Sequence, residues 1–508
     1  MKKISFIFLA FNFGYLTVLS QEPGDNLFGQ PVHTVQIQFS QPGWADSLEY
    51  YYQINDTAQN AIYLKGDVTV DGVTYPNVGV RYKGNSSYNN PTPKKSLKLD
   101  FNEFVSGQKI DGLKAINLHN SFKDPTMLRE KIMLDFLNQR GVHAPRCVYA
   151  NVYINGQLYG LYTLVEEVDD SPFLKTHFGN KSGNLYRGDP SGSLQWLGNQ
   201  QSAYYSHYEL KTNEDVNDWS DLVSLIDVIN NSTNSNDFYT NLESQMSTSS
   251  YLKLRSANII FANLDSYDGS GHNYYIYNDN GKFKWIAWDV NEAFGNFKYG
   301  LTINQLECLS LFYIPNPPGS RPLPEKMFSM YPAYKTQMAD IVYQWLDTFP
   351  PAKMDSIIDT LANIIRPYVY ADNNKAYTNQ HFETNLSQNI SVPGPNGFEQ
   401  IPGLKSFYAA RYQCLKNELI SLGYWPLNVE EKEVFTSKVY PNPAEEFINF
   451  EWNGYRGEYK LIDFSGKIVE TGYWSDRGTL NLEKYPKGVY LLLLTNEQLN
   501  QQSHKIIH

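Results

Sequence analysis

Alternating apolar and polar side chains dominate the chain up to about residue 165. Strands with this period of two are predicted at residues 32–39, 61–70, 77–82, 149–154 and 158–165. Asn155-Gly156 joins the last two, and this dipeptide is a strong hairpin signal. Between the strands predicted at 77–82 and 149–154, residues 126–139 carry apolar side chains at helical spacing and end before Gly141. The pattern therefore predicts a β-rich region with one helix.

Beyond residue 215 the apolar period becomes helical. Helices are predicted at residues 220–229, 248–264, 334–346, 353–368 and 404–422. A strand pair at 273–277 and 282–288 interrupts them, with an Asn-Asp-Asn-Gly turn between its strands. Five prolines within 313–326 predict a surface loop without regular structure. The first 425 residues are thus expected to be a mixed α+β domain.

From about residue 425 onward, short alternating segments return. Five are predicted as strands, at residues 446–452, 458–463, 467–473, 479–482 and 488–495. Turn residues separate them, which is typical of a small all-β sandwich. A chain of 508 residues is also long enough to require at least two folding units.

Charge and cysteine usage exclude some functions. The formal net charge of −11 repels phosphate backbones, so nucleic acid is not an expected partner. The chain has three cysteines, Cys147, Cys308 and Cys414, which lack metal-ligand spacing. At most one disulfide can form within the chain, and packing must supply most of the stability.

The N-terminus has the pattern of a signal peptide. Lys2 and Lys3 precede an apolar run that ends near residue 19, and a polar segment with Pro23 follows. A membrane anchor is the alternative, but Asn12 and Gly14 interrupt a run already shorter than a bilayer-spanning helix needs. We expect residues 1–20 to direct export, and no stable transmembrane segment elsewhere.

Polar side chains gather at both ends of the predicted strand pair at 273–288. Asp265 follows a helix, Asn273 enters a strand, and Asp289 ends the next strand. Carboxylate and amide oxygens are ligands that Mg²⁺ accepts while it keeps waters for phosphate. The alternative is that Asp265 caps a turn and Asp289 simply ends a strand.

An earlier basic segment could hold phosphate. Gly84, Asn85 and Ser86 can present backbone N–H groups and a hydroxyl, and a lysine at position 95 or 98 can follow as a point charge. Such loops and surface lysines are also common without any ligand.

These segments together resemble the CotH family of spore-coat-type protein kinases. The matching stretches, in order, are 81–87 with 94–98, 128–131, 155–169, 263–277 (with GHNYYIY) and 288–295 (WDVNEAFG). The resemblance covers residues 30–425. It implies an atypical, two-lobed protein-kinase fold with a β-rich N-lobe and a mainly helical C-lobe, and it implies ATP and Mg²⁺ or Mn²⁺ as cofactors.

Phosphoryl transfer assigns roles to these positions. The resemblance implies Lys98, with Lys95 as substitute, at the phosphates and Glu130 paired with that lysine. It implies Asp265 as catalytic base and Asn273 and Asp289 at the metal. Glu166 and Glu167 follow the strand that would connect the lobes, so their backbone is expected to face the adenine. Asp268 is the rival base, because Asp268 and Asn273 have the five-residue spacing of ordinary kinases. The chain departs from those kinases in lacking a Gly-x-Gly-x-x-Gly loop.

Residues 436–508 resemble a type IX secretion sorting domain. VYPNPA at 439–444, Ser465-Gly466-Lys467 and Lys487-Gly488-Val489-Tyr490 carry the likeness. It implies a partner in the secretion machinery and a location outside the cell or on its outer surface. An adhesive β-sandwich is the alternative.

The sequence therefore favours a secreted or surface-attached kinase that phosphorylates Ser or Thr of a protein substrate. A non-catalytic surface protein that adheres to polysaccharide or protein is the second hypothesis. A hydrolase with Asp265 and Asp268 as paired carboxylates is the third.

Overall fold

The computed structural model describes residues 22–55, 61–394, 397–425, 437–497 and 501–508. These fall into two compact units that divide between Tyr424 and Trp425. The expected signal peptide, residues 1–20, lies outside the described residues. Along the described part of the chain, every helix is too short or too polar to cross a bilayer.

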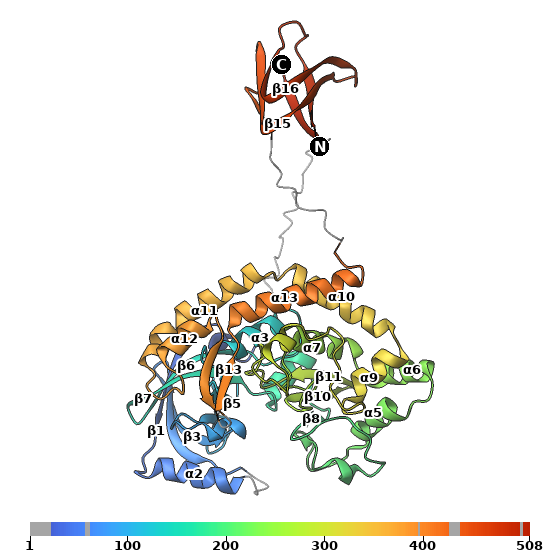
Figure 1. Ribbon diagram of the computed structural model, residues 1–508. Helices are drawn as coiled ribbons and strands as arrows, with labels where there is room; N and C mark the ends of the chain where they lie inside the picture. The colour runs from blue at the N-terminus through green and yellow to red at the C-terminus, as the bar shows by residue number, and fades with distance from the viewer. Residues whose placement is uncertain (1–21, 56–60, 395–396, 426–436, 498–500) are drawn as a thin grey trace, which may run out of the picture. The chain divides into compact units, whose positions relative to one another are not determined.

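The first strands of the larger unit close into a barrel (Figure 1). Its members are β1 (Val32–Gln38), β2 (Leu64–Val70), β3 (Val73–Lys83), β4 (Ser96–Asp100), β5 (Ala115–His119), β6 (Cys147–Ile154) and β7 (Gln157–Glu166). Closure follows the order β1-β2-β3-β4-β5-β7-β6, and the β1–β6 pair is parallel. The inward side chains of these alternating strands form one buried apolar cluster. The predicted β-rich N-terminal region is confirmed.

Three further short elements lie next to the barrel strands in the sequence. Helix α1 (Asp25–Phe28) precedes β1, α2 (Trp44–Asn55) packs on β2 and β3, and the 3₁₀ turn η1 (Ser86–Asn89) follows β3. Helix α3 (Arg129–Asn138) lies within the predicted range 126–139 and packs on β6. Its apolar face and its first turn are both buried, so it connects the barrel to the rest of the unit.

The second half of the larger unit is mainly helical around a small sheet of order β11-β10-β8-β9. The strands are β8 (Leu185–Arg187), β9 (Glu209–Leu210), β10 (Tyr274–Asp279) and β11 (Lys282–Ala287), and a separate hairpin is β12 (Ile390–Gly394) and β13 (Gly397–Ile401). The helices are α4 (Ser171–Phe178), η2 (Gln201–Tyr204), α5 (Ser220–Asn231), α6 (Ser235–Gln245), α7 (Thr248–Ile260), α8 (Ile303–Glu307), α9 (Pro322–Met330), α10 (Ala333–Asp347), α11 (Pro351–Ala371), α12 (Asn379–Asn385) and α13 (Leu404–Ser421). Figure 1 shows α10, α11 and α13 side by side as one layer of long helices.

The expectation of an irregular segment over 313–326 is only partly right. Residues 313–321 are irregular, but α9 begins at Pro322. Pro322 and Pro324 lie in the first turn of the helix, where backbone N–H groups have no intrahelical partner and proline costs nothing.

One disulfide joins Cys308, which directly follows α8, to Cys414 in α13. Cys147 is buried and free. This agrees with the expected limit of one disulfide within the chain.

The smaller unit is all β, as predicted. Its strands are β14 (Lys438–Tyr440), β15 (Phe447–Asp463), β16 (Ile468–Asn481), β17 (Val489–Asn496) and β18 (Gln501–Ile507). Predicted strands 446–452 and 458–463 are one strand, because a register shift between Glu451 and Arg456 replaces the expected turn. Gly457 is needed there for close backbone approach, since a Cβ would lie 1.9 Å from the Thr495 carbonyl oxygen.

Candidate functional site

A polar cavity of about 240 Å³ lies between the barrel and the small central sheet. The barrel side contributes Arg81, Lys83, Gly84, Asn85, Ser86, Ser87, Ser96, Lys98, His119, Asn120, Ser121, Phe122 and Glu130. Glu167 and Asp169, which follow barrel strand β7, also line the cavity. The other side contributes Arg187, Asp189, Lys211, Asp265, His272, Asn273, Tyr275, Trp288, Asp289, Asn291 and Glu292. Cationic groups and carboxylates thus face one shared space.

The loop after β3 forms one edge of this cavity. Gly84 has φ of 92°, and a Cβ there would lie 2.0 Å from the Ser87 hydroxyl oxygen, so the tight turn requires glycine. The Tyr52 hydroxyl donates to the Gly84 carbonyl at 2.7 Å, and the Asn120 amide donates to the Ser87 carbonyl at 3.2 Å. The loop is therefore held in place with its polar groups toward the cavity.

Lys98 in β4 is held by two carboxylates beyond β7. Its ammonium lies 2.8 Å from Glu167 and 3.6 Å from Asp169. Burial opposes the charged form, but these carboxylates outweigh it and raise the pKa of Lys98 well above its usual value. The pKa of Glu167 is lowered, because the charges of Lys98 and Lys83 outweigh its own burial. Lys98 is a permanent cation in the cavity.

The expected ion pair between Glu130 and Lys98 is wrong. Glu130 lies in the first turn of α3, beside the end of β5, and its carboxylate contacts the His119 ring at 2.8 Å. Glu167 takes the expected role of holding Lys98.

The Lys95 and Glu166 side chains point away from the cavity. The expectation that the Glu166 and Glu167 backbone faces the adenine is not addressed by their side-chain contacts and stays a prediction. The Lys95 ammonium donates to the Tyr88 and Asn90 carbonyls at 2.7 and 2.6 Å, so it fastens the turn after β3. Glu166 is buried and accepts from the Arg146 guanidinium at 2.9 Å. Neighbouring residues at the end of β7 face opposite sides, which is why Glu167 enters the cavity and Glu166 does not.

Asp265 lies in the loop after α7 and is oriented by three donors. Its carboxylate contacts the His272 ring at 2.7 Å, the Ser270 hydroxyl at 3.2 Å and the Asn273 amide at 3.1 Å. Burial lowers the pKa of His272, but the Asp265 carboxylate outweighs it and the pKa is raised. The Asp265 carboxylate is held by this network and lines the cavity.

Asp268, the rival base, has a structural environment. It is 1% exposed and pairs with the buried Arg255 guanidinium. Asn258 also donates to its carboxylate, at 2.9 Å. Asp268 does not line the cavity that Asp265 lines.

Asn273 and Asp289 are brought together by the β10–β11 hairpin. Tyr274 pairs with Ala287, so the residues just before β10 and just after β11 lie at the same end of the ladder. Asn273 and Asp289 have φ of 58° and 50°, in the left-handed region that non-glycine residues rarely occupy and that is frequent at functional sites. Burial, with the nearby Glu130 and Asp265 charges, raises the pKa of Asp289.

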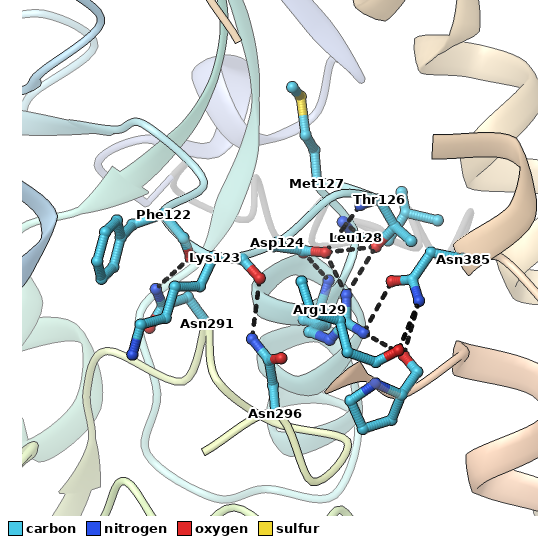
Figure 2. A network of polar contacts seen from close by, with 12 residues as sticks. Phe122, Lys123, Asp124, Thr126, Met127, Leu128, Arg129, Asn291, Asn296 and Asn385 are labelled. Atoms are coloured by element: carbon cyan, nitrogen blue, oxygen red, sulfur yellow. Dashed lines mark hydrogen bonds and ion pairs between the residues drawn. The ribbon is translucent and has the colours of Figure 1, made fainter. Parts of the chain in front are cut away.

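A buried network fixes the wall of the cavity after β5 (Figure 2). The Asp124 carboxylate pairs with the Arg129 guanidinium, which also donates to Asn385 at 3.1 Å. The Asn291 and Asn296 amides donate to the Phe122 and Lys123 carbonyls at 3.2 and 2.9 Å. The loop therefore joins the barrel, α12 and the segment after Asp289.

Sequence reasoning missed several cavity residues. Lys83 contacts Asn117 at 2.8 Å and the His119 ring at 3.2 Å, and burial lowers its pKa to about 8. It belongs to the basic segment already noted, so its position was a usable signal. His119 and Arg187 lie on strands β5 and β8, which the apolar period did not reveal. Glu292 lines the cavity three residues after Asp289.

The arrangement suits an anion and a cation held together. Lys98, Lys83 and the Gly84 loop offer positive charge and donors, and Asp265, Asn273 and Asp289 offer oxygens. The Asn273 amide nitrogen is used by Asp265, so its oxygen is left out of that bond. These donors fit Mg²⁺ or Mn²⁺ with a phosphate ligand.

Comparison with known proteins accounts for both units. Residues 438–508 match the secretion system C-terminal sorting domain, so the protein is exported to the outer surface or beyond. Residues 80–415 match the family described as CotH kinase protein.

Individual relatives are distant. The chain is 26% identical to inner spore coat protein H of Bacillus subtilis (strain 168) over 44% of its own length and 60% of that protein. It is 22% identical to invasin CotH2 and 21% identical to invasin CotH3 of Rhizopus delemar, over 61% and 72% of its own length and 56% and 64% of theirs. The chain thus spans less than two thirds of each relative. Because the family match covers most of the larger unit and contains every cavity residue, the chain belongs to the CotH kinase protein family.

Proposed function

We propose that this protein is a secreted or surface-attached protein kinase that transfers the γ-phosphoryl group of ATP to Ser or Thr hydroxyls of a partner protein. The observation that supports this best is the placement of Asp265, Asn273 and Asp289 in one cavity with Lys98 and the Gly84 loop. The proposed fold is an atypical two-lobed kinase, with the barrel as N-lobe and the helical half as C-lobe.

The cofactors would be ATP and Mg²⁺ or Mn²⁺, which supply the phosphoryl group and a counter-charge. Lys98 and Lys83, with the loop Gly84-Asn85-Ser86, would bind phosphate oxygens. Asn273 and Asp289 would hold the cation. Glu167 keeps Lys98 charged and in place by its contact at 2.8 Å.

Asp265 would accept the proton of the attacking hydroxyl. His272, Ser270 and Asn273 fix the orientation of its carboxylate, and that orientation is what a general base requires. Asp268 is committed to Arg255, so we assign the role to Asp265.

The export signal constrains where the reaction occurs. Free ATP is scarce outside cells, so phosphorylation of the protein substrate before or during export agrees best with a kinase that carries a sorting domain. The secretion machinery that reads this domain is then a second partner.

The activity test is phosphate incorporation from γ-labelled ATP with Mg²⁺ or Mn²⁺, into the chain itself or a generic acceptor protein. Asp265→Asn should reduce incorporation by about 100-fold or more, because general-base assistance is of that size, and Asp289→Asn should abolish it. Asp359→Asn is the matched control, since this acid pairs with Lys405 on the surface of α11 and should keep full activity. Equal phosphate incorporation by the unmodified chain and all three variants would refute the proposal.

Adhesion is the second candidate, because two relatives are named invasins. A purely adhesive protein should bind its target equally well after Asp265→Asn and Asp289→Asn. Its binding should also be indifferent to ATP and divalent cations.

A further inference from the structure

Three ligand-type side chains meet at the barrel side of the cavity. His119 ends β5, Glu130 lies in the first turn of α3, and Asp289 follows β11. One ligand atom of each lies within 4.8 Å of those of the other two. Two successive elements of the first half and a third from much later in the sequence thus place one nitrogen and two oxygen donors around one point.

Glu130 provides a second, independent observation that points to a ligand at this place. It is 4% exposed, and its Oε1 atom contacts the His119 ring nitrogen Nδ1 at 2.8 Å. Its other oxygen, Oε2, is buried and has no hydrogen-bond partner among the described residues. A buried carboxylate oxygen without a partner is costly, and in a residue that lines the cavity it suggests a cation.

The imidazole is held in position to act as a ligand. Its Nε2 atom contacts the Lys83 ammonium at 3.2 Å and its Nδ1 atom contacts the Glu130 carboxylate at 2.8 Å, so the ring orientation is fixed and a bound cation would replace one of these two contacts. The Trp288 ring packs edge-on against it, with centroids 5.9 Å apart, and Trp288 directly precedes Asp289. The same local packing therefore positions two of the three donors.

We infer that His119, Glu130 and Asp289 form a divalent-cation site that binds a first-row transition ion, such as Mn²⁺, without nucleotide. Mg²⁺ in phosphoryl-transfer sites is usually held by one or two carboxylates together with substrate phosphates and waters. A set with an imidazole nitrogen and two carboxylates is complete enough to bind before ATP does, and nitrogen donors favour transition ions over Mg²⁺.

This inference shares Asp289 with the proposed function, but it requires no phosphoryl transfer. It concerns which ion the site selects and when that ion binds. His119 and Glu130 thereby gain a role distinct from that of Asn273, which the proposed function places at the cation with nucleotide.

The test is titration of the full chain with Mn²⁺ alone, followed by calorimetry and by pulsed electron paramagnetic resonance. We expect one tight Mn²⁺ per chain without ATP, weaker binding of Mg²⁺, and a ¹⁴N coupling from a directly bound imidazole. His119→Gln should abolish the coupling and weaken Mn²⁺ binding by about ten-fold or more. Glu130→Gln should weaken binding to a similar degree.

Asp359→Asn is the control, because it also changes an acid to an amide but lies on the surface of α11 beside Lys405. It should bind Mn²⁺ as the unmodified chain does. Mn²⁺ binding only with ATP, or without ¹⁴N coupling in the unmodified chain, would overturn the inference even if a variant failed to fold. Nucleotide-free Mn²⁺ binding in a chain without kinase activity would uphold it and refute the proposed function instead.

Discussion

At the scale of single residues, Asp265 and Asp268 show how partners decide the role of a side chain. They are three positions apart, yet Asp268 is 1% exposed in a pair with Arg255 while Asp265 lines the cavity. Asp268 therefore stabilises the core, whereas Asp265 is placed to contact a substrate.

Substitution should separate these two roles. Asp268→Asn leaves the Arg255 charge buried without its counter-ion, so we expect a loss of about 3–5 kcal/mol in unfolding free energy. Asp265→Asn should lower activity with little change in the unfolding temperature. Thermal unfolding and phosphate incorporation, measured on both variants, check this. The assignment of Asp265 would fail if Asp268→Asn folded normally and were the inactive one.

Glu292 predicts a specific dependence of stability on pH. It is 5% exposed, and burial raises its pKa from 4.5 to about 7. The folded state then holds a proton that the unfolded state has released, so Glu292 lowers stability as pH rises from about 4.5 through 7. The full effect is of the order of 3 kcal/mol above pH 7.

Glu292→Gln removes this titration and keeps the shape of the side chain. The variant should be more stable than the unmodified chain at pH 8 and should lose that advantage near pH 5. Lys123, which contacts Glu292 at 3.2 Å, is retained in both proteins. An advantage that did not change with pH would show that Glu292 is already ionised in the folded state.

The sequence was informative for single side chains where a motif fixed them. Lys98, Asp265, Asn273 and Asp289 all line the cavity, as expected of residues in one site. The sequence did not reveal which side chains contact these four residues. Glu167 replaced Glu130 beside Lys98 because the facing side of β7 depends on barrel register, which no local pattern encodes.

At the scale of elements, the loop between β5 and α3 connects packing to the site. Ser121, Lys123 and Met127 have positive φ, and a buried ion pair joins Asp124 in the loop to Arg129, the first residue of α3. Figure 2 shows that the same loop receives amides from Asn291 and Asn296. The conformation therefore depends on contacts from both halves of the unit.

Asp124→Asn should destabilise the large unit and disturb the cavity together. Arg129 would remain buried with its main counter-charge removed, which costs about 3–5 kcal/mol. The control is Lys131→Ala, which breaks an i,i+4 pair with Asp135 worth at most about 1 kcal/mol. Urea unfolding and Mn²⁺ affinity measure both effects. Unaltered affinity in a destabilised Asp124→Asn variant would separate the loop from the site.

Most elements with a clear apolar period were predictable. The helices near residues 129, 220, 248, 333, 351 and 404 and the strands β1, β2, β6, β7, β10 and β11 all appear in the expected places. Barrel closure was not predictable, because the parallel β1–β6 pair joins segments more than a hundred residues apart. Helix α2 and strand β18 were missed, since their polar faces hide the period.

At the scale of the whole molecule, the Cys308–Cys414 disulfide fits a protein made for export. Its sequence separation is 106 residues, so it restrains a long loop of the unfolded chain. Reduction, or Cys308→Ser with Cys414→Ser, should lower stability by up to about 4–5 kcal/mol. Thermal unfolding with and without reductant measures this. Cys147→Ser is the control, because Cys147 is a buried free thiol. Reductant should lower the unfolding temperature of this variant by the same amount as that of the unmodified chain.

The central claim is that one cavity in the larger unit binds a nucleotide and a divalent cation. The most direct measurement is a crystal structure of the chain with Mn²⁺ and a non-hydrolysable ATP analogue. We predict Mn²⁺ against Asp289 and the phosphates between Lys98 and the loop at Gly84. Nucleotide bound elsewhere, or Asp289 without metal while nucleotide is present, would contradict the account.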